Sequence, residues 1–217
     1  MSAINYKLVL IGNYGSGKTT LINKISQGVN PTPNPINILE TDRISINLEL
    51  NIEKNGVKEK QPFIVTIIET AGNLRFLSVT KSYFHKSDGF LLMYDITDRK
   101  SFDDIEMWIN IVKETINENS KYAMILIGFT SRVGEDNQER TVTGEEGYEK
   151  AEKLNLIWGG EHDIKNMCFD DIKKLINVYV KEIYDVMAGE SIETINKIIK
   201  LGKVKKGKSS CVPKKNK

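Results

Sequence analysis

The chain of 217 residues has few cysteines and prolines and no long hydrophobic run. Only Cys168 and Cys211 are present, and such sparse cysteine fits a reducing, intracellular compartment. A run of about 18 apolar residues, which a membrane-spanning helix needs, does not occur. The first residues, Met1-Ser2-Ala3-Ile4-Asn5-Tyr6, lack the charged and apolar regions of a signal peptide. We therefore expect a cytoplasmic protein, of a length that suits one α/β domain with a tail.

Acidic residues are absent from the C-terminal end. From Lys197 onward there are nine lysines and no Asp or Glu, so this end carries a charge of +9. The net charge of +2 leaves −7 on the remainder of the chain. Two interpretations follow: a solvated, disordered end, or a basic segment that is attracted reversibly to anionic membrane.

The most informative motif is a Gly-rich segment of the form G-x-x-x-x-G-K-[ST], residues 12–19. It follows an apolar run, 8–11, that is typical of a buried parallel strand, and it precedes a helix-like segment, 19–26. That order of strand, loop and helix is the setting in which the motif binds phosphate. Backbone N–H groups and the positive helix end would face phosphate oxygens, Lys18 would reach the β and γ phosphates, and Thr19 would offer its hydroxyl to Mg²⁺. The alternative is an ordinary Gly-rich turn before a helix.

Elsewhere, strand-like and helix-like segments alternate. Alternating apolar residues predict a strand over 44–50, and Asn55-Gly56 leads to a second strand over 63–68, in an antiparallel hairpin with a loop of more than two residues. Apolar runs predict buried strands over 89–94 and 123–127. Further helices are expected to begin at Ser101, where Asp104 would complete a capping pattern, then at Thr143, and over about 169–186.

Together these segments predict an α/β fold of the P-loop NTPase type. The sheet would have about six strands, mainly parallel with one antiparallel edge hairpin, and helices on both faces. The chain would divide into a domain over 1–188 and a basic, largely disordered tail over 189–217. In such sheets ligands bind at the carboxyl ends of the strands, where the Gly-rich loop lies.

With these motifs in order, the chain resembles a small GTPase of the Ras superfamily, closest to the Rab branch, over roughly residues 5–186. The matching stretches are the phosphate loop, Thr70-Ala71-Gly72 with Arg75-Phe76, and Tyr94 to Asp98 leading into Ser101-Phe102 and Trp108. The resemblance implies GTP or GDP as ligand, Mg²⁺ as cofactor, and effector and regulator proteins as partners. It implies a monomer without specific affinity for nucleic acid. The residues expected at the nucleotide are Gly12, Asn13, Tyr14, Gly15, Ser16, Gly17, Lys18, Thr19, Thr20 and Gly72.

Several nucleotide-contacting elements depart from the family pattern. Glu69 stands where an aspartate normally holds Mg²⁺ through a water, and it adds a methylene. Asn73 stands where a glutamine orients the attacking water and is one carbon shorter. A misplacement near 1 Å can cost about 100-fold in rate, so we expect slow hydrolysis, with Asn73 a weak positioner and Lys18 stabilising charge. Tyr14 would crowd the space above the γ-phosphate, unless its ring turns to solvent.

The metal-binding threonine of the first switch segment is not evident. Counting from Thr19 places Asn37 near that position, while Thr32 comes early and Thr41 late. Thr41 is the candidate metal ligand because it directly precedes a predicted strand. The alternative is that none of these residues touches the metal.

The base-reading motif departs furthest. Where the family has Asn-Lys-x-Asp, this chain has Phe129-Thr130-Ser131-Arg132, and arginine cannot accept hydrogen bonds from guanine donors. The usual Ser-Ala-Lys element is replaced by about Gly160-Glu161-His162. Loss of the acceptor predicts weakened base discrimination.

The C-terminus also differs, because Cys211 is followed by six residues and matches no prenylation ending. Ile192, Ile195, Ile198 and Ile199 share one helical face, which could touch a membrane, pack on the domain or meet a partner helix.

Three functions remain open. The first is a slow Rab-like GTPase that acts as a nucleotide-dependent switch in intracellular vesicle trafficking, with possible peripheral membrane contact. The second is a non-catalytic pseudo-GTPase interaction module. The third is a P-loop NTPase with relaxed base specificity, such as an ATPase.

Overall fold

The fold was analysed in a computed structural model of the whole chain. The structure describes residues 2–28, 43–54, 57–117, 119–130 and 139–200. The proposed metal ligand Thr41, the alternatives Thr32 and Asn37, and Arg132 all lie outside these ranges.

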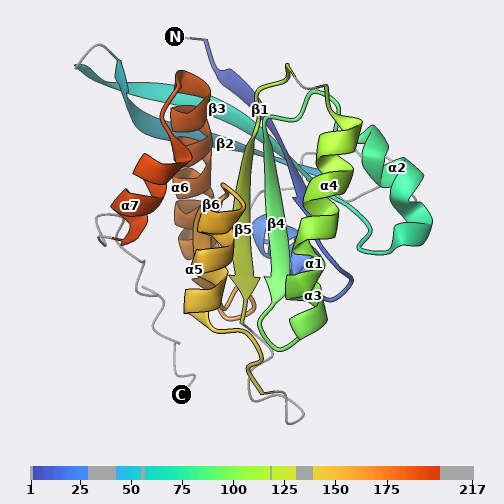
Figure 1. Cartoon of the computed structure of the whole chain (residues 1–217). Coiled ribbons are helices and arrows are strands. Elements are labelled where there is room, and N and C mark those ends of the chain that lie inside the picture. Colours follow the sequence, from blue (N-terminus) through green and yellow to red (C-terminus); the bar gives the residue numbers. More distant parts are fainter. Residues whose placement is uncertain (1, 29–42, 55–56, 118, 131–138, 201–217) are drawn as a thin grey trace.

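A six-stranded sheet forms the centre of the molecule, in the order β2-β3-β1-β4-β5-β6 (Figure 1). All neighbouring strands pair in parallel except β2, which pairs with β3 in antiparallel fashion at one edge. The predicted sheet, mainly parallel with one antiparallel edge hairpin, is confirmed. The strands are β1 (Ile4–Ile11), β2 (Arg43–Lys54), β3 (Val57–Glu69), β4 (Gly89–Asp95), β5 (Ala123–Phe129) and β6 (Ile157–His162).

Helices cover both faces of this sheet. None of the helices in the described ranges combines the length and hydropathy that a membrane span requires. The helices are α1 (Lys18–Ser26), the 3-10 turn η1 (Leu74–Phe76), α2 (Leu77–Ser82), α3 (Arg99–Asp103), α4 (Ile105–Thr115), α5 (Gly144–Lys153), α6 (Phe169–Ala188) and α7 (Ile192–Lys200).

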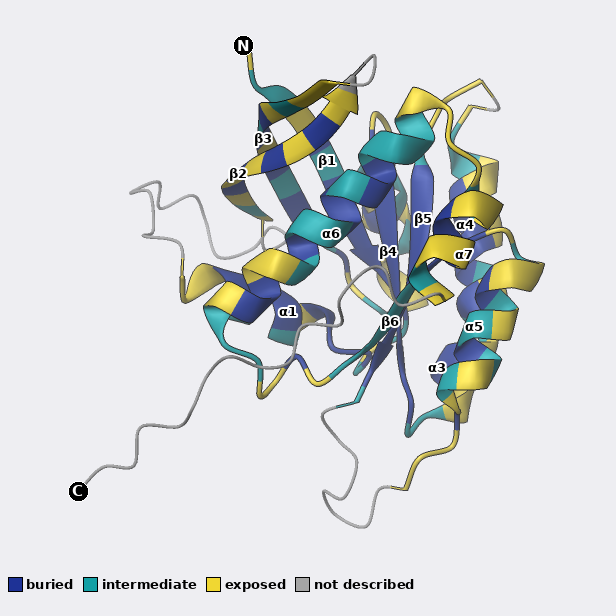
Figure 2. Ribbon diagram, turned by 90° about the vertical axis from the view of Figure 1, so that its left-hand side faces the viewer, coloured by how far each residue is buried: buried dark blue, intermediate teal, exposed yellow. Residues whose placement is uncertain are grey.

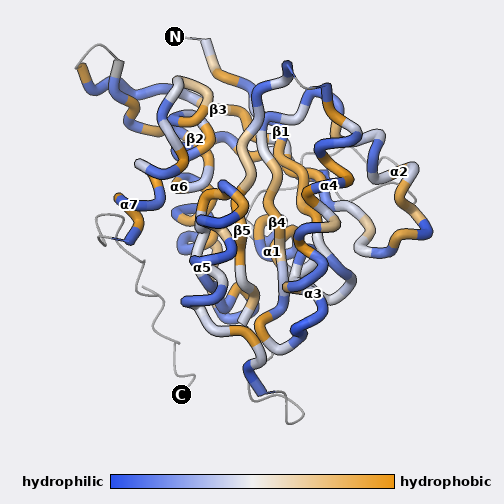
Figure 3. Tube along the Cα trace, viewed as in Figure 1, coloured by the Kyte–Doolittle hydropathy of each residue, from blue (hydrophilic) through white to orange (hydrophobic). Residues whose placement is uncertain are grey.

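The sheet separates two hydrophobic cores. Figure 2 shows its central strands buried between the covering helices. Every residue of β4 and β5 is buried, because alternate side chains enter opposite cores and neither face meets water. Apolar side chains of α1 and α6 fill one core, and those of α3, α4 and α5 fill the other. Figure 3 shows hydrophobic residues along the central strands and a mixture of hydrophobic and hydrophilic ones along the covering helices. Hydrophobic burial on both sides therefore holds the strand ends in place.

The edge hairpin differs from its prediction in the length of its loop. β2 and β3 remain paired up to Lys54 and Val57, so that only residues 55 and 56 connect them. The prediction of a longer loop was wrong because the strands extend past the alternating apolar stretch. A two-residue connection containing Asn-Gly is a common hairpin turn.

The helix that was predicted to begin at Ser101 begins earlier. The Asp98 side chain accepts a hydrogen bond from the Lys100 amide and caps α3. Ser101 lies inside the helix, fully buried, and its hydroxyl donates to the Asp98 carbonyl. Asp104, expected to complete a capping pattern, makes no side-chain cap hydrogen bond at α4. The capping prediction was wrong, because the Asp104 carboxylate accepts hydrogen bonds from the side chains of Asn13 and Lys100 instead.

α7 lies within the segment 189–217 that was predicted to be a tail. Its Asn196 is 2% exposed and lies against the edge strand β6. The Asn196 amide donates to the Leu156 carbonyl (2.8 Å) and accepts from the Trp158 amide (2.9 Å). Ile195 of α7 is buried in the core, and Ile192 and Ile199 pack against it, whereas Ile198 is exposed. Most of the isoleucine face therefore packs on the domain, which is one of the three roles left open by the sequence. Residues 201–217 lie outside the described ranges.

We predict that Asn196→Ala lowers the free energy of unfolding by about 2 to 4 kcal/mol, because it leaves a buried donor and a buried acceptor at β6 without partners. Urea denaturation followed by circular dichroism measures this. Lys197→Ala, an exposed neighbour on the same helix, is the control and should change stability by less than about 0.5 kcal/mol. Equal midpoints for the two variants would contradict the role assigned to Asn196.

Candidate functional site

The phosphate loop, residues 12–17, connects the carboxyl end of β1 to the first residue of α1. Gly17 caps α1 with φ +88°, a left-handed conformation that favours glycine. A Cβ atom at Gly17 would lie 2.5 Å from the Phe129 ring, so the loop packs directly on the end of β5. Backbone conformation and close packing both require glycine here, and they aim the helix N-terminus at the site.

The side chain of Lys18, the first residue of α1, is surrounded by the phosphate loop, and only 4% of the residue is exposed. Its ammonium donates to the carbonyl oxygens of Gly12 (2.9 Å) and Asn13 (2.7 Å) and to the Ser16 hydroxyl (3.3 Å). Burial lowers the pKa of Lys18 to about 8, and the charge of Glu69 opposes that shift. A buried ammonium that has only neutral partners within hydrogen-bond distance is suited to binding an anion.

The Asn13 side chain ties the phosphate loop to α4. Asn13 donates to the Asp104 carboxylate (2.7 Å) and accepts from the Trp108 indole N–H (2.8 Å). Lys100 also donates to Asp104 (2.9 Å). Partial burial acts to raise the pKa of Asp104, but the hydrogen bonds from Asn13 and Lys100 outweigh it and the pKa is lowered. The carboxylate therefore stays ionised, and Asn13 holds the loop through two directed hydrogen bonds.

A site suited to Mg²⁺ lies beside Lys18. The Thr19 hydroxyl at the start of α1 donates to the Glu69 carboxylate at the end of β3. Hydroxyl and carboxylate oxygens are ligands that Mg²⁺ prefers, so these two residues fit the ion. No cluster of three or more His, Cys, Asp or Glu that could hold a metal occurs among the described residues. Mg²⁺ commonly binds one or two protein carboxylates together with substrate phosphates and several waters.

Gly72 lies directly on the phosphate loop. Its carbonyl accepts a hydrogen bond from the Tyr14 amide (3.1 Å), and a Cβ atom at Gly72 would lie 2.3 Å from that amide nitrogen. The Thr70 hydroxyl donates to the Leu10 carbonyl (2.7 Å) and fixes the start of this segment to β1. The Tyr14 ring is 87% exposed and lies at the rim of the site.

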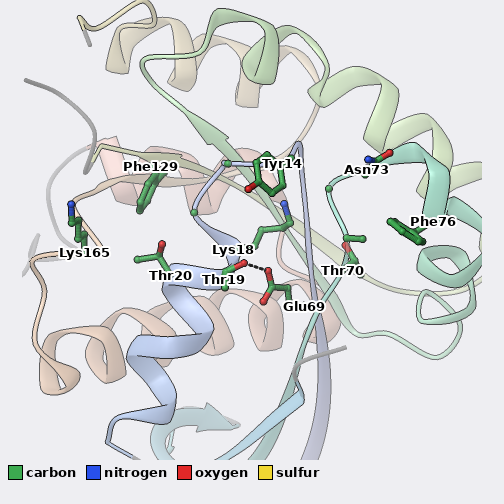
Figure 4. A pocket seen from close by; sticks show the side chains of 14 residues that line it. Tyr14, Lys18, Thr19, Thr20, Glu69, Thr70, Asn73, Phe76, Phe129 and Lys165 are labelled. Carbon is green, nitrogen blue, oxygen red and sulfur yellow. Dashed lines mark hydrogen bonds between the residues drawn. The ribbon is translucent and has the colours of Figure 1, made fainter. Parts of the chain in front are cut away.

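Asn73 is placed to cap a helical turn. Its side-chain oxygen accepts from the Arg75 amide (3.0 Å) at the start of η1. In Figure 4 it lies apart from Lys18 and Thr19. In this conformation the side-chain amide oxygen of Asn73 is engaged by the backbone N–H of Arg75.

The region expected to read the base contains an aromatic side chain and an ion pair. Phe129 is 4% exposed and packs on Gly17. Glu161, at the end of β6, accepts two hydrogen bonds from Arg140 (2.8 and 3.0 Å). The His162 ring lies 2.7 Å from the Gly159 carbonyl oxygen. The one carboxylate of the Gly160-Glu161-His162 element is therefore engaged by a cation.

These residues surround a cavity of about 740 Å³ (Figure 4). That volume lies within the usual range for small-molecule sites. The cavity brings together nine of the predicted residues: Tyr14, Gly15, Gly17, Lys18, Thr19, Thr20, Glu69, Gly72 and Asn73.

Three predicted loop residues, Gly12, Asn13 and Ser16, lie beneath the cavity and contact Lys18. Phe76 and Lys165 line the cavity but were not anticipated, because neither belongs to a phosphate motif. The contact of Asp104 with the loop was also missed, since it joins positions 91 residues apart.

The Ras family model matches residues 7–176 of this chain. The Ras-related protein SEC4 of Saccharomyces cerevisiae is 29% identical over 94% of this chain and 84% of its own length. The Ras-related protein Rab-8B of Homo sapiens is 34% identical over 71% of this chain and 66% of its own length. The Ras-related protein SEC4 of Candida albicans is 32% identical over 69% of this chain. The chain spans 65% of the length of that Candida relative.

The matched range includes the phosphate loop, the Thr70-Ala71-Gly72 segment and the buried strands β4 and β5. The chain therefore belongs to the Ras family of small GTPases, close to the Rab branch.

Proposed function

We propose that this protein binds GTP and GDP with Mg²⁺ and hydrolyses GTP slowly, as a Rab-like switch. The observation that carries the proposal is the buried Lys18 ammonium at the phosphate loop, beside the Thr19–Glu69 pair, in a cavity of about 740 Å³. Family membership supports the GTPase class.

In this proposal the phosphates are bound by Lys18, by the loop amides and by the N-terminal end of α1. Charge that develops on the phosphate oxygens during transfer would be stabilised by the same groups, because they are already oriented before the reaction. Thr19 and Glu69 would hold Mg²⁺, which supplies further positive charge at the β and γ phosphates when bound.

The contact between Gly72 and Tyr14 supports a switch. The Tyr14 amide is one of the loop donors available to phosphate, and it now donates to the Gly72 carbonyl. A phosphate that takes this donor would release Gly72 and the segment that follows it. Leu74, Phe76 and Val79 in that segment are exposed apolar residues, which suits a surface for effector and regulator proteins. A role in vesicle trafficking follows from the likeness to Ras-related SEC4 and Rab-8B.

Two alternatives remain, each supported by features of the site. The capping role of Asn73 favours a non-catalytic pseudo-GTPase module. The buried Phe129 and the engaged Glu161 favour a P-loop NTPase with relaxed base specificity. The predictions below distinguish them from the first proposal.

We predict that Lys18→Ala weakens binding of a fluorescent GTP analogue by about 100-fold or more, since a buried charged partner of the phosphates is lost. Equilibrium fluorescence titration measures this. Lys24→Ala removes a cation from the same helix outside the cavity and should leave the affinity unchanged. Unchanged affinity in Lys18→Ala would refute the phosphate-loop assignment.

We predict intrinsic GTP hydrolysis slower than about 10⁻³ s⁻¹, above which the rate would exceed the intrinsic scale of Ras. Asn73→Gln should raise the rate in single-turnover assays, because the longer amide can reach an attacking water. Asn73→Ala is the matched control and should leave the rate nearly unchanged if Asn73 positions water poorly. A large loss of rate in Asn73→Ala would show that Asn73 already acts at the reaction.

We predict a GTP preference over ATP smaller than about 10⁴-fold, because no acceptor matched to guanine is evident in the replaced motif. Competition among GTP, ATP and ITP measures it. Glu161→Gln tests the carboxylate of the Gly160-Glu161-His162 element and should leave the ratio unchanged, since Arg140 engages both oxygens. A preference above that limit which Glu161→Gln abolishes would identify Glu161 as the base reader.

We propose a cytoplasmic monomer whose Lys-rich end attracts it reversibly to anionic membrane. Each basic residue near such a surface contributes about 1 kcal/mol, and the attraction decays within a Debye length. Co-sedimentation with phosphatidylserine vesicles should therefore weaken steeply between low and physiological salt. A chain in which the seven lysines after Lys200 are changed to glutamine is the control. Equal sedimentation of the two chains would exclude this role.

A further inference from the structure

A groove of about 270 Å³ lies between α6 and α7. One wall is apolar and is formed by Ile195, Ile198 and Ile199 of α7. Ile198 is 42% exposed, which is unusual for an isoleucine beside a packed helix. The other wall carries Asn177 and Glu182 of α6. We refer to this feature as the α6–α7 groove.

The polar atoms in this groove are incompletely satisfied. The oxygens Asn177 Oδ1 and Glu182 Oε2 are buried and have no hydrogen-bond partner among the described residues. Glu182 is 6% exposed. Leaving such acceptors without partners is costly. Both residues line the groove, so an occupant that supplies hydrogen-bond donors would offset this cost.

The cation nearest to Glu182 along α6 compensates its buried charge only in part. Lys181 lies on the same groove, but its ammonium is engaged by Asp185 one turn further on. Burial raises the pKa of Glu182 to about 8, Asp185 raises it further, and Lys181 opposes the shift. A second ammonium in the groove would offset this burial.

Lysine has the chemistry that fits both walls. Its aliphatic stem can lie along the isoleucines while its ammonium supplies three donors and no acceptor. The chain carries seven lysines and no acid after Lys200, the last residue of α7. Because α7 is itself a wall of the groove, a segment that continues from Lys200 is tethered beside it. Tethering raises the effective concentration of such a segment to the millimolar range.

We propose that the α6–α7 groove is a docking site for a lysine of the segment 201–217. The lysine stem covers the exposed Ile198 and the half-buried Ile199, and the ammonium donates to Glu182 and Asn177. Docking withholds that lysine from other anionic partners, so the groove competes with membrane for the basic end. This site is independent of the nucleotide cavity and of the hydrolysis proposed above.

The test measures lysine reactivity in the full-length protein. Limited acetylation followed by peptide mass spectrometry gives the labelling rate of each lysine. Glu182→Gln should raise the rate of at least one lysine in 201–217 roughly tenfold, because a hydrogen-bonded ammonium is protected. Glu182→Leu should act in the same way and keeps the groove apolar. Glu190→Gln removes an exposed acid just beyond α6 and should leave every rate unchanged.

Carbodiimide cross-linking identifies the occupant. A mixture of ¹⁵N-labelled and unlabelled chains distinguishes a Glu182–lysine link within one chain from a link between two chains. An intramolecular link to the segment 201–217 supports the proposal. Equal labelling rates in the parent chain and in Glu182→Gln would overturn it, as would a link only between chains, which would make a second copy the occupant. Vesicle co-sedimentation tests the membrane proposal separately. Glu182→Gln should strengthen vesicle binding only if both the groove proposal and the membrane proposal hold.

Discussion

The buried ammonium of Lys18 is the constraint on which the site depends. A charge removed from water requires several oriented oxygens, and the carbonyls of Gly12 and Asn13 together with the Ser16 hydroxyl provide them. Those oxygens can converge only if the loop adopts its tight, glycine-dependent path between β1 and α1. The same path points the loop amides toward the cavity. One electrostatic requirement thus shapes both the loop and its capacity to bind an anion.

The loop is held from the opposite side of the sheet as well. Trp108 of α4 and Asp104, the residue directly before α4, belong to the helix layer over the second core, yet both bond the Asn13 side chain. Trp108 is 1% exposed, so its indole N–H needs a buried acceptor, and Asn13 supplies it. The Gly72 carbonyl also holds the loop, because it accepts a hydrogen bond from the Tyr14 amide. Movement of the phosphate loop is therefore coupled to α4 and to the segment after β3.

The phosphate loop and the α6–α7 groove differ in how their polar groups are satisfied. In the loop, the Lys18 ammonium donates to three oxygens. At the α6–α7 groove, Asn177 and Glu182 retain buried acceptors without one in the described residues. Asn196, by contrast, uses both its donor and its acceptor on β6 and anchors α7. The anchored helix keeps the groove open beside the point where the basic segment begins.

The sequence by itself determined the mainly parallel sheet with its antiparallel edge hairpin and the phosphate loop that follows the first strand. These depend on local patterns: apolar runs, a Gly-rich motif of fixed spacing, and capping residues such as Thr143. Only the tertiary structure decided that Asp104 holds the loop instead of capping a helix, that Asn73 caps η1, and that α7 packs on β6. Each of these contacts depends on side-chain direction or joins distant positions, and neither property is encoded in local spacing. The position of Thr41 lies outside the described residues, so its place at the metal stays a prediction.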